Sequence, residues 1–202
     1  YGPLATVPTG FAPASYSDQL PLELCNYDLE KAKSLLSEAG YAFGEAEITI
    51  YSNNSTESQS IGEICQNMWT QAGFKVNLIQ NDFSAIATEV RAYKGSGCLM
   101  NWSWGADNLG LFLNDWDPTY ETNMTYAYDE RITALKQEAN ACLDATRRTE
   151  IYHEMQEILY YEDMAQIMIA DKMLAFIATP NVTGFAGDPT GAPLLCDVIV
   201  YE

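Results

Sequence analysis

Basic residues are scarce in this chain of 202 residues, which has 10 lysines and arginines against 28 aspartates and glutamates. The formal charge of −18 repels phosphate backbones and anionic lipid headgroups, so no nucleic-acid partner is expected. A cationic or amine-bearing ligand is only mildly favoured, because many soluble proteins have acidic surfaces for no reason connected with a ligand.

Long apolar runs are also missing. The longest candidate, residues 167–170 followed by 173–178, is interrupted by Asp171 and Lys172 and is shorter than the roughly 20 residues that span a bilayer. The chain opens on Tyr1-Gly2-Pro3-Leu4, without an initiating Met or the pattern of a signal peptide. We therefore expect a piece of a longer protein.

Histidine and paired cysteines are lacking as well. One histidine, His153, cannot form a multi-histidine metal site, and a His-Asp nucleophile relay is not expected around it. The five cysteines lie far apart without a CxxC pair, so neither a zinc site nor a dense disulfide scaffold is predicted, and no cofactor is expected. Asp115 and Asp117 leave a carboxylate-based hydrolase as an alternative hypothesis, although residues in a loop have no set separation.

The periodicity of apolar residues predicts an α/β fold. Asp28 is expected to cap a helix that runs to about residue 39, and a capping box of Thr56 and Gln59 starts a second helix that Gly73 ends. Alternating apolar residues predict strands at 47–51 and 74–78 on either side of this second helix. Strand, helix and strand in succession indicate a parallel pair with a right-handed crossover.

The sequence pattern is less regular in the rest of the chain. The first 26 residues contain four prolines and are expected to be mostly irregular. A short helix at 83–93, a third and central strand at 98–104 and a loop to residue 128 should follow. Two helices are predicted at 129–143 and 147–162, the second with an apolar face. The segments 167–170, 173–179 and 195–201 are predicted to be closing strands.

Four stretches resemble motifs of one protein family. Residues 27–41 are similar to a helix that begins Asp-Pro-Glu-Lys-Ala-Lys and ends Leu-Leu-x-Glu-Ala-Gly, with Leu29 in place of the proline. Residues 61–76 resemble an amphipathic helix that closes on a glycine and re-enters the sheet. Trp104-Gly105-Ala106-Asp107 looks like a Trp-x-Ala-Asp element, and residues 147–159 look like a helix with an Arg, Tyr, Ala-Gln pattern. In this order and spacing, the four stretches resemble the family 5 extracellular solute-binding proteins, which bind peptides or nickel.

This resemblance implies a periplasmic-binding-protein-like (class II) lobe, with a mixed sheet flanked by helices. Residues 1–175 would form part of the second, carboxy-terminal ligand-binding lobe. Residues 176–202 would be a return segment that rejoins the first lobe in the full-length protein.

The resemblance also implies a function without enzymatic activity. The protein would be the substrate-binding component of an ABC importer that captures a small peptide between two lobes and delivers it to the permease subunits in the membrane. It would act in the periplasm or at the extracellular face of the membrane, held there by a lipid anchor. Oligosaccharide or metal-chelate binding is the alternative, and the excised lobe is expected to self-associate.

The resembled family places the ligand at the Trp-Gly-Ala-Asp element. Asp107 would pair with the ammonium group of the ligand, while the backbone of Ser103 and Gly105 would bond the peptide main chain. Trp102 and Trp104 are candidates for stacking on the ligand, or else for ordinary core positions. A simple turn at Asp107 and Asn108 is the alternative to a binding role. Many relatives have Asp-Pro or Glu-Pro after this element, and the Asn-Leu-Gly found here leaves the ligand class open.

Overall fold

A computed structural model describes residues 2–92, 95–99, 108–121, 123–173, 175–187 and 193–201. The chain divides into two compact units. One unit consists of residues 25–102, and the other combines residues 1–24 with residues 103–202.

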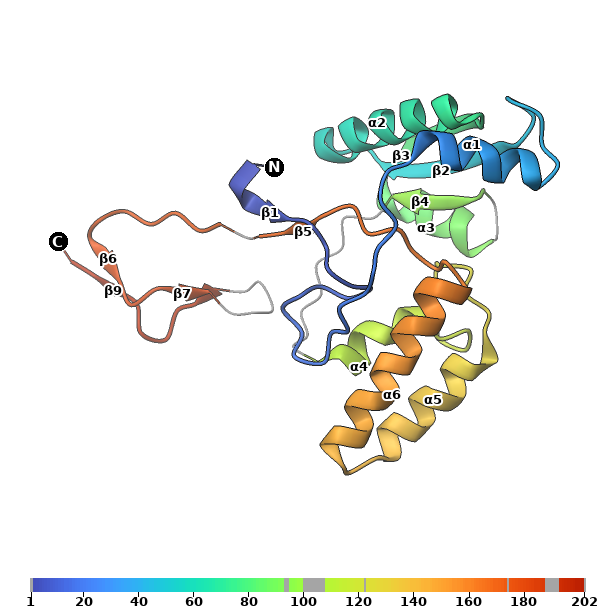
Figure 1. Cartoon of the computed structure of the whole chain (residues 1–202). Coiled ribbons are helices and arrows are strands. Elements are labelled where there is room, and N and C mark those ends of the chain that lie inside the picture. Colours follow the sequence, from blue (N-terminus) through green and yellow to red (C-terminus); the bar gives the residue numbers. More distant parts are fainter. Residues whose placement is uncertain are drawn as a thin grey trace. The chain divides into compact units, whose positions relative to one another are not determined.

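The unit of residues 25–102 is a parallel sheet between helices, in the order β3-β2-β4 (Figure 1). β2 is parallel to both of its neighbours, and α2 and α3 cover opposite faces of the sheet. The elements are α1 (Leu29–Glu38), β2 (Glu47–Asn53), α2 (Thr56–Ala72), β3 (Lys75–Asn81), α3 (Phe83–Arg91) and β4 (Gly97–Leu99). The predicted parallel pair is confirmed. Among the described strands the prediction that the third strand is central is wrong, because the chain passes from β3 along α3 to the far side of β2.

Local side chains start and end these helices largely as the sequence indicates. The Asp28 carboxylate accepts a hydrogen bond from the Lys31 amide at 2.9 Å, and Gly73 ends α2 with a left-handed φ of 112°. The predicted capping box of Thr56 and Gln59 is wrong by one residue. Ser55 is the N-cap and accepts from the Ser58 amide, because Ser55 has an extended backbone while Thr56 is already helical.

The second unit is mainly helical. Its helices are α4 (Leu109–Phe112), η2 (Leu113–Trp116), α5 (Glu130–Ala141), α6 (Ala145–Glu157) and a π-helical turn, η3 (Ile158–Glu162). The predicted helix pair is confirmed, and Ile151, Met155 and Leu159 of its apolar face are fully buried. The prediction of a loop up to residue 128 is wrong at 109–116. Four apolar residues there are buried at helical spacing: Leu109, Phe112, Leu113 and Trp116.

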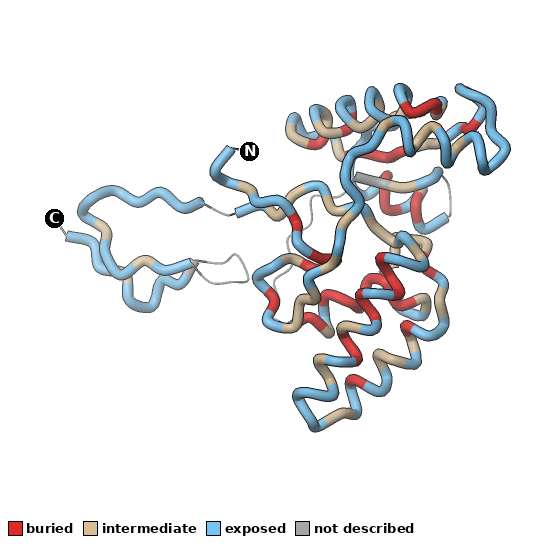
Figure 2. The backbone as a smooth tube through the Cα atoms, viewed as in Figure 1, coloured by how far each residue is buried: buried red, intermediate tan, exposed pale blue. Residues whose placement is uncertain are grey.

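The amino-terminal segment belongs to the core of this second unit, which Figure 2 marks by burial. Phe11 is fully buried, and its ring meets the Trp116 ring edge-on with 5.1 Å between centroids. Gln156, also fully buried, donates to the Asp18 carbonyl and accepts from the Leu20 amide, both at 3.1 Å. Gln156 of α6 thus bonds the irregular segment at two points, and Thr149 of α6 adds a third by donating to the Asp18 carboxylate at 2.6 Å.

The strands of the second unit are short. Its described residues contain η1 (Gly2–Leu4) and three antiparallel pairs: β1 (Ala5–Thr6) with β5 (Asp171–Lys172), β6 (Val182–Thr183) with β9 (Ile199–Val200), and β7 (Ala186–Gly187) with β8 (Pro193–Leu194). Parallel and antiparallel pairing with flanking helices confirms the α/β class.

The predicted closing strands are mostly wrong. Residues 167–170 form no strand, nor do the described residues of 173–179, and only Ile199–Val200 of 195–201 is a strand. Apolar alternation needs a neighbouring strand, and Ile167 and Ile177 are instead largely exposed. Among the described residues no helix has the length and apolar character needed to cross a membrane.

Candidate functional site

The residues predicted to bind the ligand lie outside the described part of the chain: Trp102, Ser103, Trp104, Gly105 and Asp107. Their neighbours in sequence are described. β4 ends at Leu99, and Asn108 is the N-cap of α4. β4 runs parallel to β2, so the candidate element follows a carboxyl end of the parallel sheet. In open α/β sheets, ligands bind beyond the carboxyl ends of the strands.

Asn108 is the described half of the alternative hypothesis of a simple turn at Asp107 and Asn108. Its side-chain oxygen accepts a hydrogen bond from the Gly110 amide at 2.7 Å, which starts α4. Asn108 is thus the N-cap of α4, and Asp107 lies outside the described residues.

Asp117 is a buried structural carboxylate. Lys136 Nζ donates to it at 2.8 Å, Thr133 Oγ1 at 2.7 Å, and the amide and hydroxyl of Thr119 at 2.9 and 2.8 Å. Burial by itself raises the pKa of Asp117, but the bonds from Lys136, Thr119 and Thr133 outweigh it and lower the pKa to about 2. A general acid or base needs a pKa near the working pH and access to a substrate, and Asp117 has neither.

Lys136 completes this buried ion pair. Its ammonium group also lies over the Tyr120 ring, 4.6 Å from the centroid. Asp115, the other carboxylate of the hydrolase hypothesis, is buried as well. In the described ranges, no group of three or more His, Cys, Asp or Glu side chains is arranged to hold a metal ion. The arrangement around Asp117 stabilises the fold and offers no catalytic pair.

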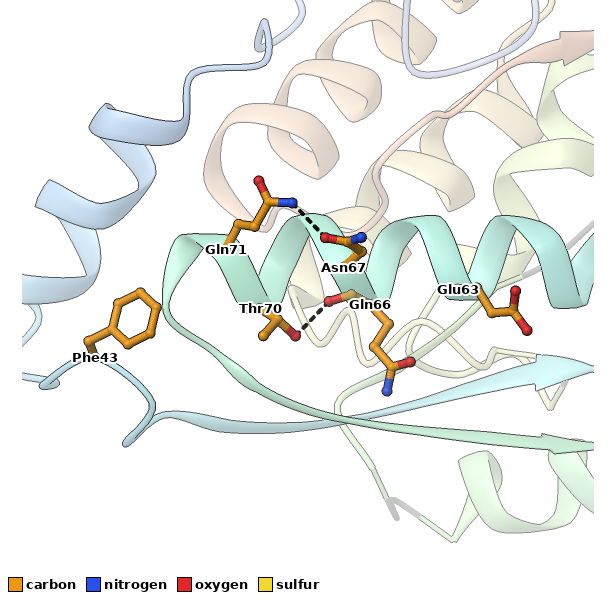
Figure 3. Close-up of a pocket in the computed structure, with 6 residues that line it drawn as sticks. All are labelled: Phe43, Glu63, Gln66, Asn67, Thr70 and Gln71. Atoms are coloured by element: carbon orange, nitrogen blue, oxygen red, sulfur yellow. Dashed lines mark hydrogen bonds between the residues drawn. The ribbon is translucent and has the colours of Figure 1, made fainter.

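Described residues of the unit 25–102 line two of the molecule's surface hollows. The larger, of about 610 Å³, is lined by Phe43 and by side chains along α2 (Figure 3). Several of these α2 side chains bond within their own helix: Gln71 Nε2 donates to Asn67 Oδ1 at 2.5 Å and Thr70 Oγ1 to the Gln66 carbonyl at 2.7 Å. A ligand would therefore compete with bonds that already exist. The smaller hollow, of about 450 Å³, lies between β3 and α3.

Sequence reasoning missed the structural importance of Gln156 and Lys136. Gln156 stood inside the stretch that resembles the Arg, Tyr, Ala-Gln helix, so the resemblance held a signal for it. A polar residue on the buried face of α6 could have been expected to bond a distant backbone. Lys136 carried no local signal, because its partner Asp117 lies 19 residues earlier in the chain.

Comparison with known proteins places these features in a family. Residues 1–127 match the family "Bacterial extracellular solute-binding proteins, family 5 Middle". The glutathione-binding protein GsiB of Salmonella choleraesuis is 28% identical over 193 residues, which is 90% of this chain and 37% of GsiB. This chain thus spans little more than a third of that relative.

Solved structures share the fold. HbpA2 from Haemophilus parasuis matches with a TM-score of 0.82 at 24% identity, over all of this chain and 41% of HbpA2. A dipeptide-binding protein from Pseudoalteromonas sp. SM9913, in complex with Met-Leu, matches with a TM-score of 0.81 at 19% identity, over 98% of this chain and 40% of that protein.

The family match covers more than half of the chain, and it includes α1, the whole parallel sheet and the candidate element at 102–107. Family members are periplasmic or extracellular proteins that bind solutes and are not enzymes. The chain belongs to the family 5 bacterial extracellular solute-binding proteins.

Proposed function

We propose that this chain is part of the substrate-binding component of an ABC importer that captures peptides. The observation that carries the proposal is the family match over residues 1–127, within which the Trp-Gly-Ala-Asp element follows β4. A protein named for binding glutathione, itself a peptide, and one solved with a dipeptide are among the similar proteins. The importer's permease subunits would receive the ligand, and a lipid anchor would hold the receptor at the membrane.

The recognition proposed here has two parts. An extended peptide offers backbone donors and acceptors, which the main chain at Ser103 and Gly105 would bond. Its amino terminus offers a charge, which Asp107 would neutralise through a charge-assisted hydrogen bond. Trp102 and Trp104 would contact side chains of the ligand. The acidic balance of the chain favours the approach of an ammonium group.

We also propose how the chain is divided between the two lobes of the receptor. Residues 1–175 would form part of one ligand-binding lobe, and residues 176–202 would return to the other lobe. Apolar side chains of the return segment support this, since Ile177 is fully exposed and Leu195 is 62% exposed. Exposed apolar side chains gathered in one segment are typical of a surface that another part of a protein covers.

Asp107→Ala in the full-length receptor tests the peptide-amine assignment. Loss of one charge-assisted hydrogen bond should weaken binding by about 1.5–3 kcal/mol, roughly tenfold to hundredfold. The loss should be confined to peptides with a free amino terminus, and amino-acetylated peptides should already bind the wild type weakly. Titration calorimetry with dipeptides and tripeptides measures both.

Asp107→Asn keeps the size of the side chain and serves as the matched variant. It should lose most of the affinity that Asp107→Ala loses, because the negative charge of Asp107 supplies most of the strength of its hydrogen bond to the ligand ammonium. Wild-type affinity in both variants would remove the amine assignment and leave an oligosaccharide or a metal chelate as the ligand to test.

The 202-residue chain by itself should self-associate. The exposed apolar side chains of residues 175–187 and 194–201 would be covered by a second copy when no other partner is present. Light scattering over a concentration series should show a rising average mass. A double variant, Ile177→Ser with Leu195→Ser, should lower that mass, and a wild-type chain that stays monomeric at high concentration would refute the expectation.

A further inference from the structure

The outer edge of β3 carries backbone groups that the sheet does not use. In a parallel pair, the N–H and C=O of one residue point to the same side, and successive residues alternate. The Lys75 amide bonds the Ala46 carbonyl at 2.8 Å, and the Asn81 carbonyl accepts from the Asn54 amide at 3.0 Å. The odd-numbered residues of β3 therefore face β2. The even-numbered residues, Val76, Leu78 and Gln80, face outward.

α2 closes the amino-terminal part of this edge. Gln66 Nε2 donates to the outward Val76 carbonyl at 3.0 Å, so that acceptor is satisfied. No hydrogen bond from elsewhere in the described chain reaches the outward groups of Leu78 and Gln80, and β3 is the last strand of the described sheet on this side. The carboxyl-terminal half of the edge thus offers two donors and two acceptors at the spacing of an extended chain.

A groove lies beside this half of the edge. It is the hollow of about 450 Å³ between β3 and α3, with an apolar floor that includes Tyr51, Ile79 and Ile86. Ile79 is 41% exposed there, because α3 packs under β2 and β4 and leaves the face of β3 open. Asn81, Thr88 and Glu89 complete the lining. An edge strand flanked by a helix and a groove is the arrangement that accepts an added strand together with one of its side chains.

We propose that the outer edge of β3 and the adjoining groove bind an extended segment of another polypeptide that is neutral or basic. Backbone groups repeated at every second residue recognise an extended main chain, and the groove takes an apolar side chain. The charge of −18 favours a neutral or basic occupant over an acidic one. Recognition at this edge needs neither a free amino terminus nor Asp107.

The test uses a seven-residue peptide in which Val alternates with Lys or Thr, acetylated and amidated at its ends. Its blocked amino terminus keeps it from the proposed amine site. Backbone amide exchange in the isotope-labelled 202-residue chain, followed by NMR, should slow at Leu78 and Gln80 when the peptide is added. Ile79 and Asn81 should change little, since their amides already bond β2. A fully N-methylated peptide with the same side chains and charge should not bind.

Two pairs of variants separate the edge from general electrostatic attraction. Gln80→Pro removes an outward donor that the sheet does not use, and it should weaken peptide binding about fivefold relative to Gln80→Ala. Thr88→Arg fills the groove and repels the peptide, whereas Ser84→Arg adds the same charge to α3 at a position that does not line the groove. The protected amides of Ile79 and Asn81 report that the strand is intact in each variant.

Three results would overturn the proposal. Equal affinity for Gln80→Pro and Gln80→Ala would show that the edge is not used. Weaker binding in Asp107→Ala would place the peptide at the proposed ligand element. Slow exchange at Leu78 and Gln80 that depends on protein concentration, without peptide, would show that a second copy occupies the edge.

Discussion

Replacing Phe11 with Ala should lower the free energy of unfolding by about 3–5 kcal/mol, the usual cost of removing a buried phenylalanine. Phe11 lies in an irregular segment near the amino terminus, yet its ring is fully buried against Phe112 and Trp116. Its removal leaves a cavity beside the aromatic rings of α4 and η2. Urea denaturation followed by circular dichroism measures the loss.

Val7→Ala is the matched control in the same segment. Val7 is 84% exposed, so its truncation should change the unfolding free energy by less than about 0.5 kcal/mol. A similarly small change for Phe11→Ala would mean that the amino-terminal segment does not belong to the core. The loss of unfolding free energy for Gln156→Leu should lie between those of Val7→Ala and Phe11→Ala, because the substitution leaves the Leu20 amide without its acceptor.

Asp117→Asn should destabilise the fold by about 3 kcal/mol at neutral pH. The substitution keeps the shape of the side chain but leaves the Lys136 ammonium, whose side chain is 17% exposed, without its counter-charge. Removing one partner of a buried ion pair costs more than the pair contributes, because the other charge remains desolvated. Thermal or urea denaturation at pH 7 measures the difference.

The ion pair of Asp117 and Lys136 also predicts that the stability of the fold depends on pH. The pKa of Asp117 is about 2 in the folded chain and close to 3.8 when unfolded, so ionised Asp117 stabilises the fold at any pH above 3.8. That contribution, about 2 kcal/mol, is lost as the pH falls from 3.8 to about 2. The Asp117→Asn variant should lack this part of the acid sensitivity.

Two controls separate the buried pair from surface charge. Glu138→Gln breaks an exposed ion pair with Arg147 and should cost less than about 0.5 kcal/mol. Adding Lys136→Met to Asp117→Asn should recover part of the lost stability, because it removes the unpaired charge. No recovery would indicate that the hydrogen bonds from Thr119 and Thr133, and not the charge of Lys136, carry the effect.

Local patterns were enough to predict the elements whose signals lie within a few residues. The apolar stripe and Asp28 predicted α1, Gly73 marked the end of α2, and alternation on either side of α2 predicted the parallel strands β2 and β3. The buried face of α6 followed from helical spacing. Each of these depends on neighbours in sequence, so each could be predicted without knowledge of the fold.

The candidate site was predicted mainly by resemblance. Residue types at 102–107 could supply a strand end and one carboxylate, and their order matched a family pattern. The carboxylates at 115 and 117 illustrate the converse. Their spacing suggested catalysis as one hypothesis, but the bonds from Lys136 and Thr133 that make Asp117 structural come from a different helix.

The sequence by itself determined the α/β class, the parallel pair and the family, because periodicity, caps and motif order are local properties that survive without a fold. Only the tertiary structure decided that β4 lies beside β2 at an edge, that Phe11 enters the core and that Gln156 bonds the chain near residues 18–20. These outcomes depend on which distant segments share a space. The tertiary structure also decided that the backbone groups of Leu78 and Gln80 point outward. A strand has a free edge only where no other strand pairs with it.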